Sequence, residues 1–176
     1  MAATVWKLDP SHTNVEFSAK HMMFTTVKGR FANVAGTVTV NGETPDTATV
    51  EAVMKAESID TRTEQRDQHL RSADFLDAAN YPDVSFKSTK VSGGKGDFQL
   101  TGDLTIRGTT HPITLDVAYE GAGKDPWGGE RMGFSATGKL DRREYGLVWN
   151  QALEAGGILV SNDVKIQIDA QLTRSA

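Results

Sequence analysis

The stretch Asp97-Phe-Gln-Leu-Thr-Gly-Asp-Leu-Thr-Ile-Arg107 alternates apolar and polar side chains along its length. The apolar phase holds Phe98, Leu100, Leu104 and Ile106, and Gly102 keeps the same phase. A period of two is typical of a β-strand that buries one face and exposes the other to water. The stretch therefore predicts an amphipathic strand whose apolar face needs a partner.

The same alternation extends outward along most of the chain, for example through Ile113 and Leu115 and through Ile166 and Ile168. We expect strands near 4–9, 14–21, 29–40, 48–57, 83–92, 97–107, 110–120, 131–142 and 162–174, with 145–151 as a further candidate. When nearly every segment has one apolar face, these faces must meet in a sandwich or a closed barrel. The outer phase forms no second apolar face, which favours a barrel over a two-layer α/β fold.

Two segments interrupt the alternation. Residues 64–80 favour a helical insertion, because Leu70, Ala73, Leu76 and Ala79 recur at a spacing of three and Pro82 follows them. The second segment, Met22-Met23-Phe24-Thr25-Thr26-Val27, is rich in large apolar residues. We expect it to form a small helical or irregular lid over an open end of the barrel, because methionine side chains adapt to an apolar ligand.

Composition excludes several classes of protein. The 176 residues are most simply one domain, 1–176, long enough to bury a core. A net charge of −4 and a sequence pI of about 5.5 indicate no excess of basic residues for binding the phosphates of nucleic acid. The densest basic pair, Arg142-Arg143, is flanked by Asp141 and Glu144. The absence of cysteine excludes disulfides, thiolate nucleophiles and cysteine-bound metals.

The N-terminal segment has neither a basic n-region nor an apolar h-region, and no window reaches transmembrane length. We therefore expect a protein that does not insert into the membrane and that stays in the cytoplasm. A periplasmic or secreted location is the alternative if the N-terminus is processed.

Motifs that carry catalysis are missing. The chain contains no Gly-x-Ser-x-Gly elbow, no Walker loop and no His-Glu-x-x-His. The stretch Gly93-Gly94-Lys95-Gly96 is predicted to be a hairpin turn. Most carboxylates fall in the outer phase, as Asp103 and Asp116 do, so no inward acid–base pair is indicated. We expect no catalytic residues, no metal and no cofactor.

Among the four histidines, His21 is the candidate for a ligand contact. It shares phase with Phe17 and Ala19 and precedes the expected lid, so it points toward the cavity end if the phase holds. A hydrogen-bonded structural histidine is the alternative. His12 is expected to satisfy the turn that follows Asp9, and His69 to be solvated or ion-paired.

The aromatic residues are spread over many segments, most of them in inward phase or in the expected end pieces. They either fill a solid core or line a cavity, because an eight-stranded barrel lies at the size where both are possible. Small inward residues such as Ala19, Gly36, Ala52, Gly102 and Ala136 favour a narrow internal tunnel.

Several blocks, in order along nearly the whole chain, resemble the YceI-like family. They are Trp6–Phe17 with Lys20-His21, Gly29-Arg30-Phe31, Ser58–Thr61, Arg66–Leu76, Tyr81-Pro82, Gly102–Gly108, Trp127-Gly128, Gly133–Ala136, and Arg142 with Tyr145–Leu147. The resemblance implies an extended eight-stranded antiparallel barrel of lipocalin-like type that binds polyisoprenoids or other long amphiphilic chains. It also implies that related barrels hold quinones, fatty acids or fatty amides, and that many members are exported and some are tied to stress. The chain departs from the family at Leu76, where an aromatic residue is common, and the resemblance supplies no catalytic residues.

The leading interpretation is a non-enzymatic lipid-binding barrel, acting as carrier, store or sensor of a polyisoprenoid, isoprenoid quinone, fatty acid or amide. The chain of the lipid is expected to lie against Phe17, Phe31, Phe86, Phe98, Phe134 and Trp149. Met22, Met23, Phe24 and Phe75 are expected to cover the ends, with His21 at the polar head. One alternative is a barrel isomerase or hydratase that uses His21 and a nearby carboxylate. Another is a solid barrel that acts through its surface, for instance as a homodimer.

Overall fold

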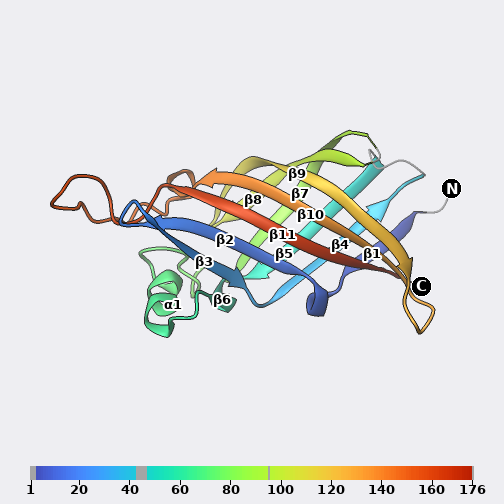
Figure 1. The fold of residues 1–176 in the computed structure, drawn as a ribbon, viewed down its shortest axis with the longest axis horizontal. Coiled ribbons are helices and arrows are strands. Elements are labelled where there is room, and N and C mark those ends of the chain that lie inside the picture. The colour runs from blue at the N-terminus through green and yellow to red at the C-terminus, as the bar shows by residue number, and fades with distance from the viewer. Residues whose placement is uncertain (1–2, 43–46, 95, 176) are drawn as a thin grey trace.

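The structure is a computed structural model that describes residues 3–42, 47–94 and 96–175. It is almost entirely β, with one α-helix and short 3-10 turns (Figure 1). The strands are β1 (Thr4–Leu8), β2 (Asn14–His21), β3 (Thr25–Phe31), β4 (Val34–Val40), β5 (Ala48–Lys55), β6 (Ile59–Asp60), β7 (Asp83–Gly93), β8 (Asp97–Ile106), β9 (Thr109–Lys124), β10 (Glu130–Asp141) and β11 (Asp163–Arg174). The helical elements are η1 (Pro10–His12), η3 (Ala56–Ser58), α1 (Glu64–Arg71) and η4 (Arg142–Tyr145).

The strands close into an eight-stranded antiparallel barrel, which confirms the predicted fold. The order around the barrel is β1-β4-β5-β7-β8-β9-β10-β11, and β11 pairs with β1 to complete the circle. The part of β11 that does not pair with β1 pairs with β2. In turn, β2 pairs with β3, and β3 pairs with β6. The barrel is therefore elongated, because β1–β2, β3–β4 and β5–β6 each extend one wall along its axis.

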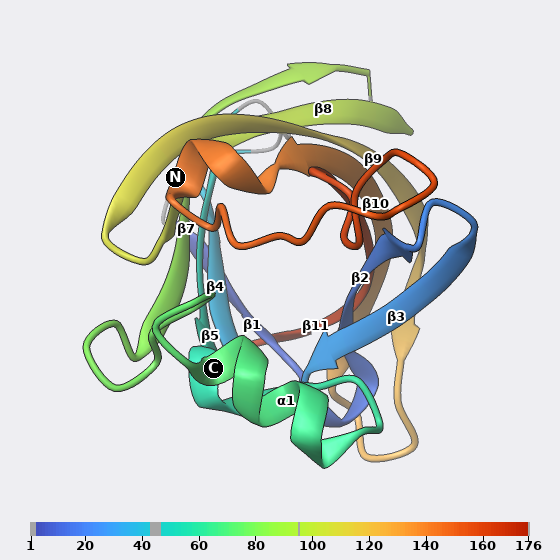
Figure 2. The ribbon, with the colours of Figure 1, turned by 90° about the vertical axis from the view of Figure 1, so that its left-hand side faces the viewer.

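The ends of the barrel differ in how they are built. At one end lie α1, the Met22–Phe24 turn and the long connection 142–162 (Figure 2). We call this the α1 end. At the other end, β1 begins, β11 finishes and the β7–β8 and β9–β10 hairpins turn. We call it the terminus end.

The alternation read from the sequence is confirmed in the central strands. On β8, Leu100 and Leu104 are buried, whereas Gln99 and Asp103 are exposed. Leu100 pairs with Leu115 on β9, so the buried side chains of neighbouring strands point inward together. Burial of these inner faces stabilises the closed barrel.

The structure divides the strand expected at 29–40. The chain bends at Ala32-Asn33, where the Ala32 N–H donates to the carbonyl oxygen of Ser58 and the Asn33 N–H donates to the Ser58 hydroxyl. The expected strand 48–57 bends at the same level, with η3 in place of its last residues. Ser58, the last residue of η3, thus connects the bend at Ala32-Asn33 with the bend that follows β5.

The expected helix 64–80 and the candidate strand 145–151 are both corrected. Helix α1 ends at Arg71, because the N–H and the hydroxyl of Ser72 both donate to the carbonyl oxygen of His69. The following residues fold as turns, in which the Leu76 N–H reaches back to Leu70. Residues 145–151 begin with the end of η4 and continue as irregular chain, because Gly146 adopts a left-handed conformation with φ 79°.

The segment 22–27 differs from the expected lid. Met22, Met23 and Phe24 form the tight turn of the β2–β3 hairpin, and the next three residues already belong to β3. Met22 and Met23 have φ values of 52° and 72°, which is the left-handed region that favours glycine and asparagine. All three side chains are exposed, Phe24 by 74%.

Candidate ligand-binding site

One elongated cavity of about 690 Å³ occupies the interior of the barrel. Its lining runs from Thr4, Val40 and Arg174 at the terminus end to Phe75 and Arg142 at the α1 end. Between them the walls are built from the inward Leu, Ile, Val, Ala and Phe side chains of the strands. The cavity is therefore a long apolar space with few polar groups, most of them near its ends.

Six of the aromatic residues predicted as ligand contacts line this cavity: Phe17, Phe31, Phe75, Phe86, Phe98 and Phe134. Four of them form two separate pairs. The rings of Phe17 and Phe31 lie 5.7 Å apart, and those of Phe98 and Phe134 lie 6.2 Å apart in a T-shaped arrangement. Tyr119, which is not among the predicted ligand contacts, also lines the cavity and extends the second pair at 5.5 Å from Phe134.

The remaining predicted contacts lie outside the lining. His21 is exposed at the end of β2, where it forms an isolated bridge with Val160. Met22, Met23 and Phe24 are on the exposed turn, with Met23 against Gly157. The turn of the β2–β3 hairpin therefore forms part of the rim of the α1 end, outside the cavity lining.

Trp149 is half-buried behind the cavity wall. Its ring lies 5.5 Å from that of Phe75 and 4.7 Å from that of His69. His69 in turn contacts Asp74 through Nε2 at 2.9 Å, so it is ion-paired or hydrogen-bonded as the sequence predicts. Trp149 thus packs against Phe75 from outside the cavity lining.

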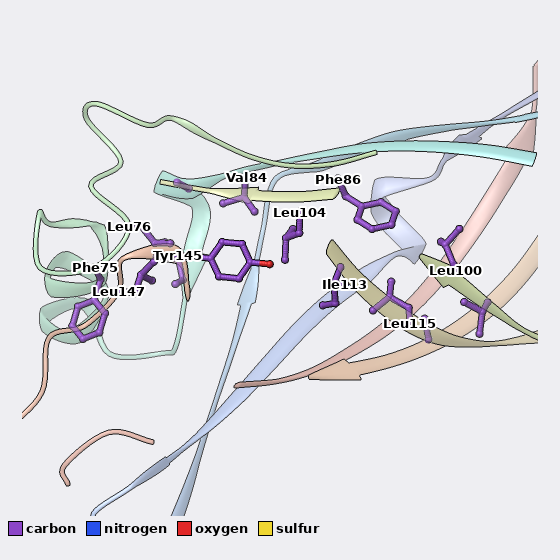
Figure 3. Packing of buried hydrophobic residues seen from close by; sticks show 14 residues of the cluster. Phe75, Leu76, Val84, Phe86, Leu100, Leu104, Ile113, Leu115, Tyr145 and Leu147 are labelled. Carbon is purple, nitrogen blue, oxygen red and sulfur yellow. The ribbon is translucent and has the colours of Figure 1, made fainter. Parts of the chain in front are cut away.

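Buried side chains seal the α1 end of the cavity (Figure 3). Phe75 and Leu76 come from the turns after α1, and Tyr145 and Leu147 come from the connection after β10. The ring of Tyr145 lies between this cluster and the barrel, and its hydroxyl points toward Leu104 and Ile113 (Figure 3). These residues form what we call the end wall: Phe75, Leu76, Arg142, Tyr145 and Leu147.

Arg142 is the charged member of the end wall and is only 4% exposed. Its guanidinium donates to the carbonyl oxygens of Leu147 at 2.5 Å, Ser161 at 2.9 Å and Val160 at 3.3 Å. It also lies 5.8 Å from the centre of the Phe75 ring. Burial lowers the pKa of Arg142 from its ordinary value. In the sequence, Arg142 and Arg143 are flanked by two acidic residues. In the structure, Asp141 forms an ion pair with Arg143 at 2.6 Å, whereas Arg142 turns inward.

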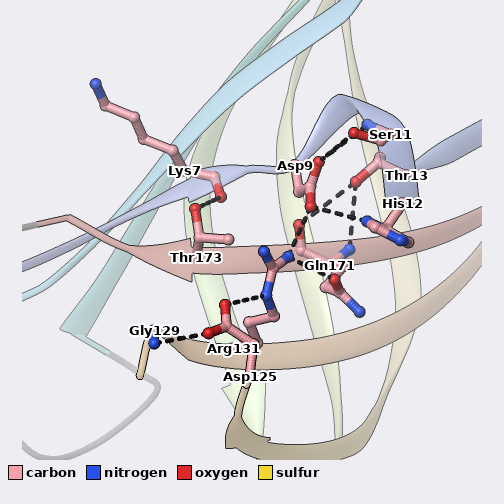
Figure 4. A network of polar contacts seen from close by, with 10 residues as sticks. All are labelled: Lys7, Asp9, Ser11, His12, Thr13, Asp125, Gly129, Arg131, Gln171 and Thr173. Carbon is pink, nitrogen blue, oxygen red and sulfur yellow. Dashed lines mark hydrogen bonds and ion pairs between the residues drawn. The ribbon is translucent and has the colours of Figure 1, made fainter. Parts of the chain in front are cut away.

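A polar network links several elements on the outer side of the barrel at the terminus end (Figure 4). Arg131 on β10 donates to Asp9 at 2.7 Å, to Asp125 at 2.9 Å and to Gln171 at 2.8 Å. His12 contacts Asp9 through Nδ1 at 2.9 Å, as expected for the turn. These contacts tie η1, β10, β11 and the β9–β10 hairpin together, so the network is structural.

Two observations bound the chemistry of the site. In residues 3–42, 47–94 and 96–175, no group of three or more histidine or acidic side chains is placed to hold a metal ion. Within the same residues, no helix is long and apolar enough to cross a bilayer.

A closed antiparallel barrel around one elongated apolar cavity defines a lipocalin-like barrel. The family model described as the YceI-like domain matches residues 6–172, and the chain belongs to this family. It is 40% identical over 147 residues to Protein YceI of Escherichia coli, covering 82% of this chain and 77% of that protein.

Solved structures show the same fold. The YceI protein of Campylobacter jejuni superposes with a TM-score of 0.77 at 27% identity, covering 89% of this chain and 90% of that one. A polyisoprenoid binding domain from Saccharophagus degradans superposes with a TM-score of 0.69 at 13% identity, covering 97% and 98% of the two chains.

Proposed function

We propose that the protein binds one long-chain lipid, an isoprenoid or another linear amphiphile, inside the barrel, as a carrier, store or sensor. The observation that carries this proposal is the continuous apolar cavity of about 690 Å³. Ligand pockets of proteins fall at about 300–1,000 Å³, so the space suits one ligand rather than a bundle of chains. Its length along the barrel axis favours an extended molecule.

The chemistry of the wall determines what the cavity selects. Apolar side chains offer no directional contacts, so affinity arises from removing the lipid chain from water, about 0.8 kcal/mol for each methylene. Such a site discriminates by length and girth, which the paired aromatic rings of Phe17–Phe31 and Phe98–Phe134 constrain. An isoprenoid chain, which carries methyl branches, fits a tunnel that alternates rings and small residues.

The comparisons support this proposal at the level of the family. The Saccharophagus degradans domain is described as polyisoprenoid binding, and it shares the fold with this chain at 13% identity. That description belongs to the neighbour. The inference for this chain rests on its own cavity together with its membership in the YceI-like family.

The alternative of an enzyme based on His21 lacks a matching geometry. His21 is exposed and outside the lining, and no Asp, Glu or His of the described residues lines the cavity. A general acid or base must reach a substrate within about 3 Å or through one water. The alternative of a solid barrel conflicts with the internal cavity itself.

A chain-length series tests the proposal. Saturated fatty acids from ten to eighteen carbons, delivered from cyclodextrin, would compete with a fluorescent fatty acid for the purified protein. We expect affinity to rise by about fourfold for each methylene until the cavity is filled, and then to level off. An affinity that does not change with length, or no displacement at any length, would contradict binding inside the barrel.

A further inference from the structure

Tyr145 presents a buried hydroxyl that the fold leaves without a short hydrogen bond. The side chain is 1% exposed, and within the described part of the chain its hydroxyl reaches only the carbonyl oxygen of His111, at 3.5 Å. Hydroxyl donors in proteins usually lie about 2.5–3.0 Å from their acceptors, so this contact is weak. Burial raises the pKa of Tyr145 to about 12, which keeps the phenol protonated and able to donate.

This hydroxyl faces the cavity. Tyr145 lines the cavity, and its oxygen points into the barrel toward Leu104 and Ile113 (Figure 3). A buried polar group without a good partner costs free energy and calls for an explanation beyond packing. A phenylalanine would fill the same space without that cost.

Arg142 adds a buried positive charge to the same wall. None of the carboxylates in the described residues forms an ion pair with it, and its partners are carbonyl oxygens. The nearest acidic neighbour in sequence, Asp141, is bound by Arg143. A cation in an apolar, water-poor wall attracts negative charge more strongly than the same cation in water.

We propose that the end wall binds the polar end of the lipid, with a carbonyl or carboxylate oxygen accepting a hydrogen bond from the Tyr145 hydroxyl, in the same wall that holds the Arg142 guanidinium. This inference rests on the proposed function and adds to it the chemistry of the ligand. In this orientation, the hydrocarbon tail of the bound lipid extends toward the terminus end.

Two polar side chains at the terminus end, Arg174 and Thr13, are less suited to this role. Arg174 lines the cavity there, but it is paired with Glu130 at 2.8 Å. The hydroxyl of Thr13 accepts a hydrogen bond from the Gln171 N–H at 3.2 Å. Both side chains already have protein partners, whereas Tyr145 has only its long contact.

The test compares three ligands that share a sixteen-carbon chain: hexadecanoic acid, methyl hexadecanoate and hexadecane, each delivered from cyclodextrin. Tyr145→Phe keeps the ring and removes the donor, and Tyr81→Phe, a tyrosine outside the lining, is the matched control. We expect Tyr145→Phe to weaken the acid and the ester by about tenfold and to leave hexadecane unchanged. Loss for the acid alone would assign the site to carboxylates, and equal loss for both would assign it to carbonyl oxygens generally.

Other outcomes would overturn the inference. If Tyr145→Phe weakens all three ligands equally, the hydroxyl is structural, and if it weakens none, the polar end lies elsewhere. Either result leaves the proposed function intact, because hexadecane still binds. Failure of all three ligands to bind the unmodified protein would overturn both proposals.

A second measurement reads the orientation directly. Hexadecanoic acid with a carbon-13 label at the carboxyl would be observed by NMR in complex with the unmodified protein, with a soluble paramagnetic agent added. We expect the bound carboxyl resonance to be protected from relaxation, because the end wall is buried. A carboxyl relaxed as strongly as that of the free acid would place the head group in solvent and contradict the proposal.

Discussion

Gly102 on β8 lies so close to the ring of Phe86 on β7 that a Cβ at position 102 would overlap that ring. The same Cβ would stand 2.6 Å from the main-chain oxygen of Lys87. The glycine in the apolar phase of 97–107 therefore makes room for an aromatic side chain of the cavity lining.

Gly102→Ala is expected to lower the free energy of unfolding by about 2 kcal/mol, because the main chain at Lys87 cannot move aside as a side chain can. Urea unfolding measures the change. Gly133→Ala is the matched control, because a Cβ there meets no atom closer than 3.7 Å. Equal effects of the two substitutions would contradict the close packing.

Phe134→Asp is expected to abolish lipid binding while the barrel stays folded. Phe134 lines the cavity beside Phe98 and Tyr119, and a carboxylate there would be buried among apolar groups by any bound chain. Asp103→Ala on the outer face of β8 should bind lipid normally. Fluorescence displacement measures binding, and circular dichroism verifies the fold. Full binding by a folded Phe134→Asp protein would remove this side chain from the site.

Met22→Asn is expected to stabilise the protein by about 1 kcal/mol, because asparagine tolerates the left-handed conformation better than methionine. For a protein of this size that corresponds to a rise in Tm of about 2–4 °C. Lipid binding should not change, since Met22 lies outside the lining. Val148→Asn, a change at another exposed apolar residue, is the control. A lower Tm for Met22→Asn alone would show that the methionine contributes packing that outweighs the strain.

Lowering the pH is expected to destabilise the terminus end, because the Asp9 carboxylate becomes protonated. Hydrogen bonds from His12 and Arg131 hold the pKa of the Asp9 carboxyl far below its ordinary value. Because the folded pKa is depressed, this stabilisation is present above the unfolded pKa of about 4 and is lost as the pH falls toward the folded pKa. The Tm of Asp9→Asn should therefore lie below that of the unmodified protein at pH 7, with a gap that narrows below about pH 4. Thermal melts at pH 7, 5 and 3 measure it, and a gap independent of pH would contradict the assignment.

The period-two pattern predicted an all-β fold with apolar faces that meet in a sandwich or a closed barrel, because each strand must bury one face. The resemblance to the YceI-like family added the eight-stranded barrel, which the structure confirms. The expected strand 97–107 differs from β8 by its last residue only. The pattern could not predict where strands bend, since Ser58 sets the bend at Ala32-Asn33 through contacts distant in sequence.

The sequence pattern predicted strand side chains that line the walls of the cavity, but it did not predict most of the residues at the ends of the cavity. Inward phase identified Phe17, Phe86 and Phe134, because phase is a local property of a strand. The same phase placed His21 inward, but β2 reaches the rim there and the side chain is exposed. The end wall consists of turns, the four-residue 3-10 helix η4 and irregular chain, so no strand periodicity shows that Arg142 and Tyr145 turn inward. The only sequence signal for them was their place in the family-like block that also contains Gly146 and Leu147.

Native mass spectrometry of the gently purified protein, followed by organic extraction of whatever is bound, tests the central claim most directly. We predict one long-chain lipid per protein molecule, lost in Phe134→Asp and retained in Asp103→Ala. A protein that remains free of adducts after purification and after incubation with isoprenoid quinones and fatty acids would contradict a lipid-binding role for this cavity.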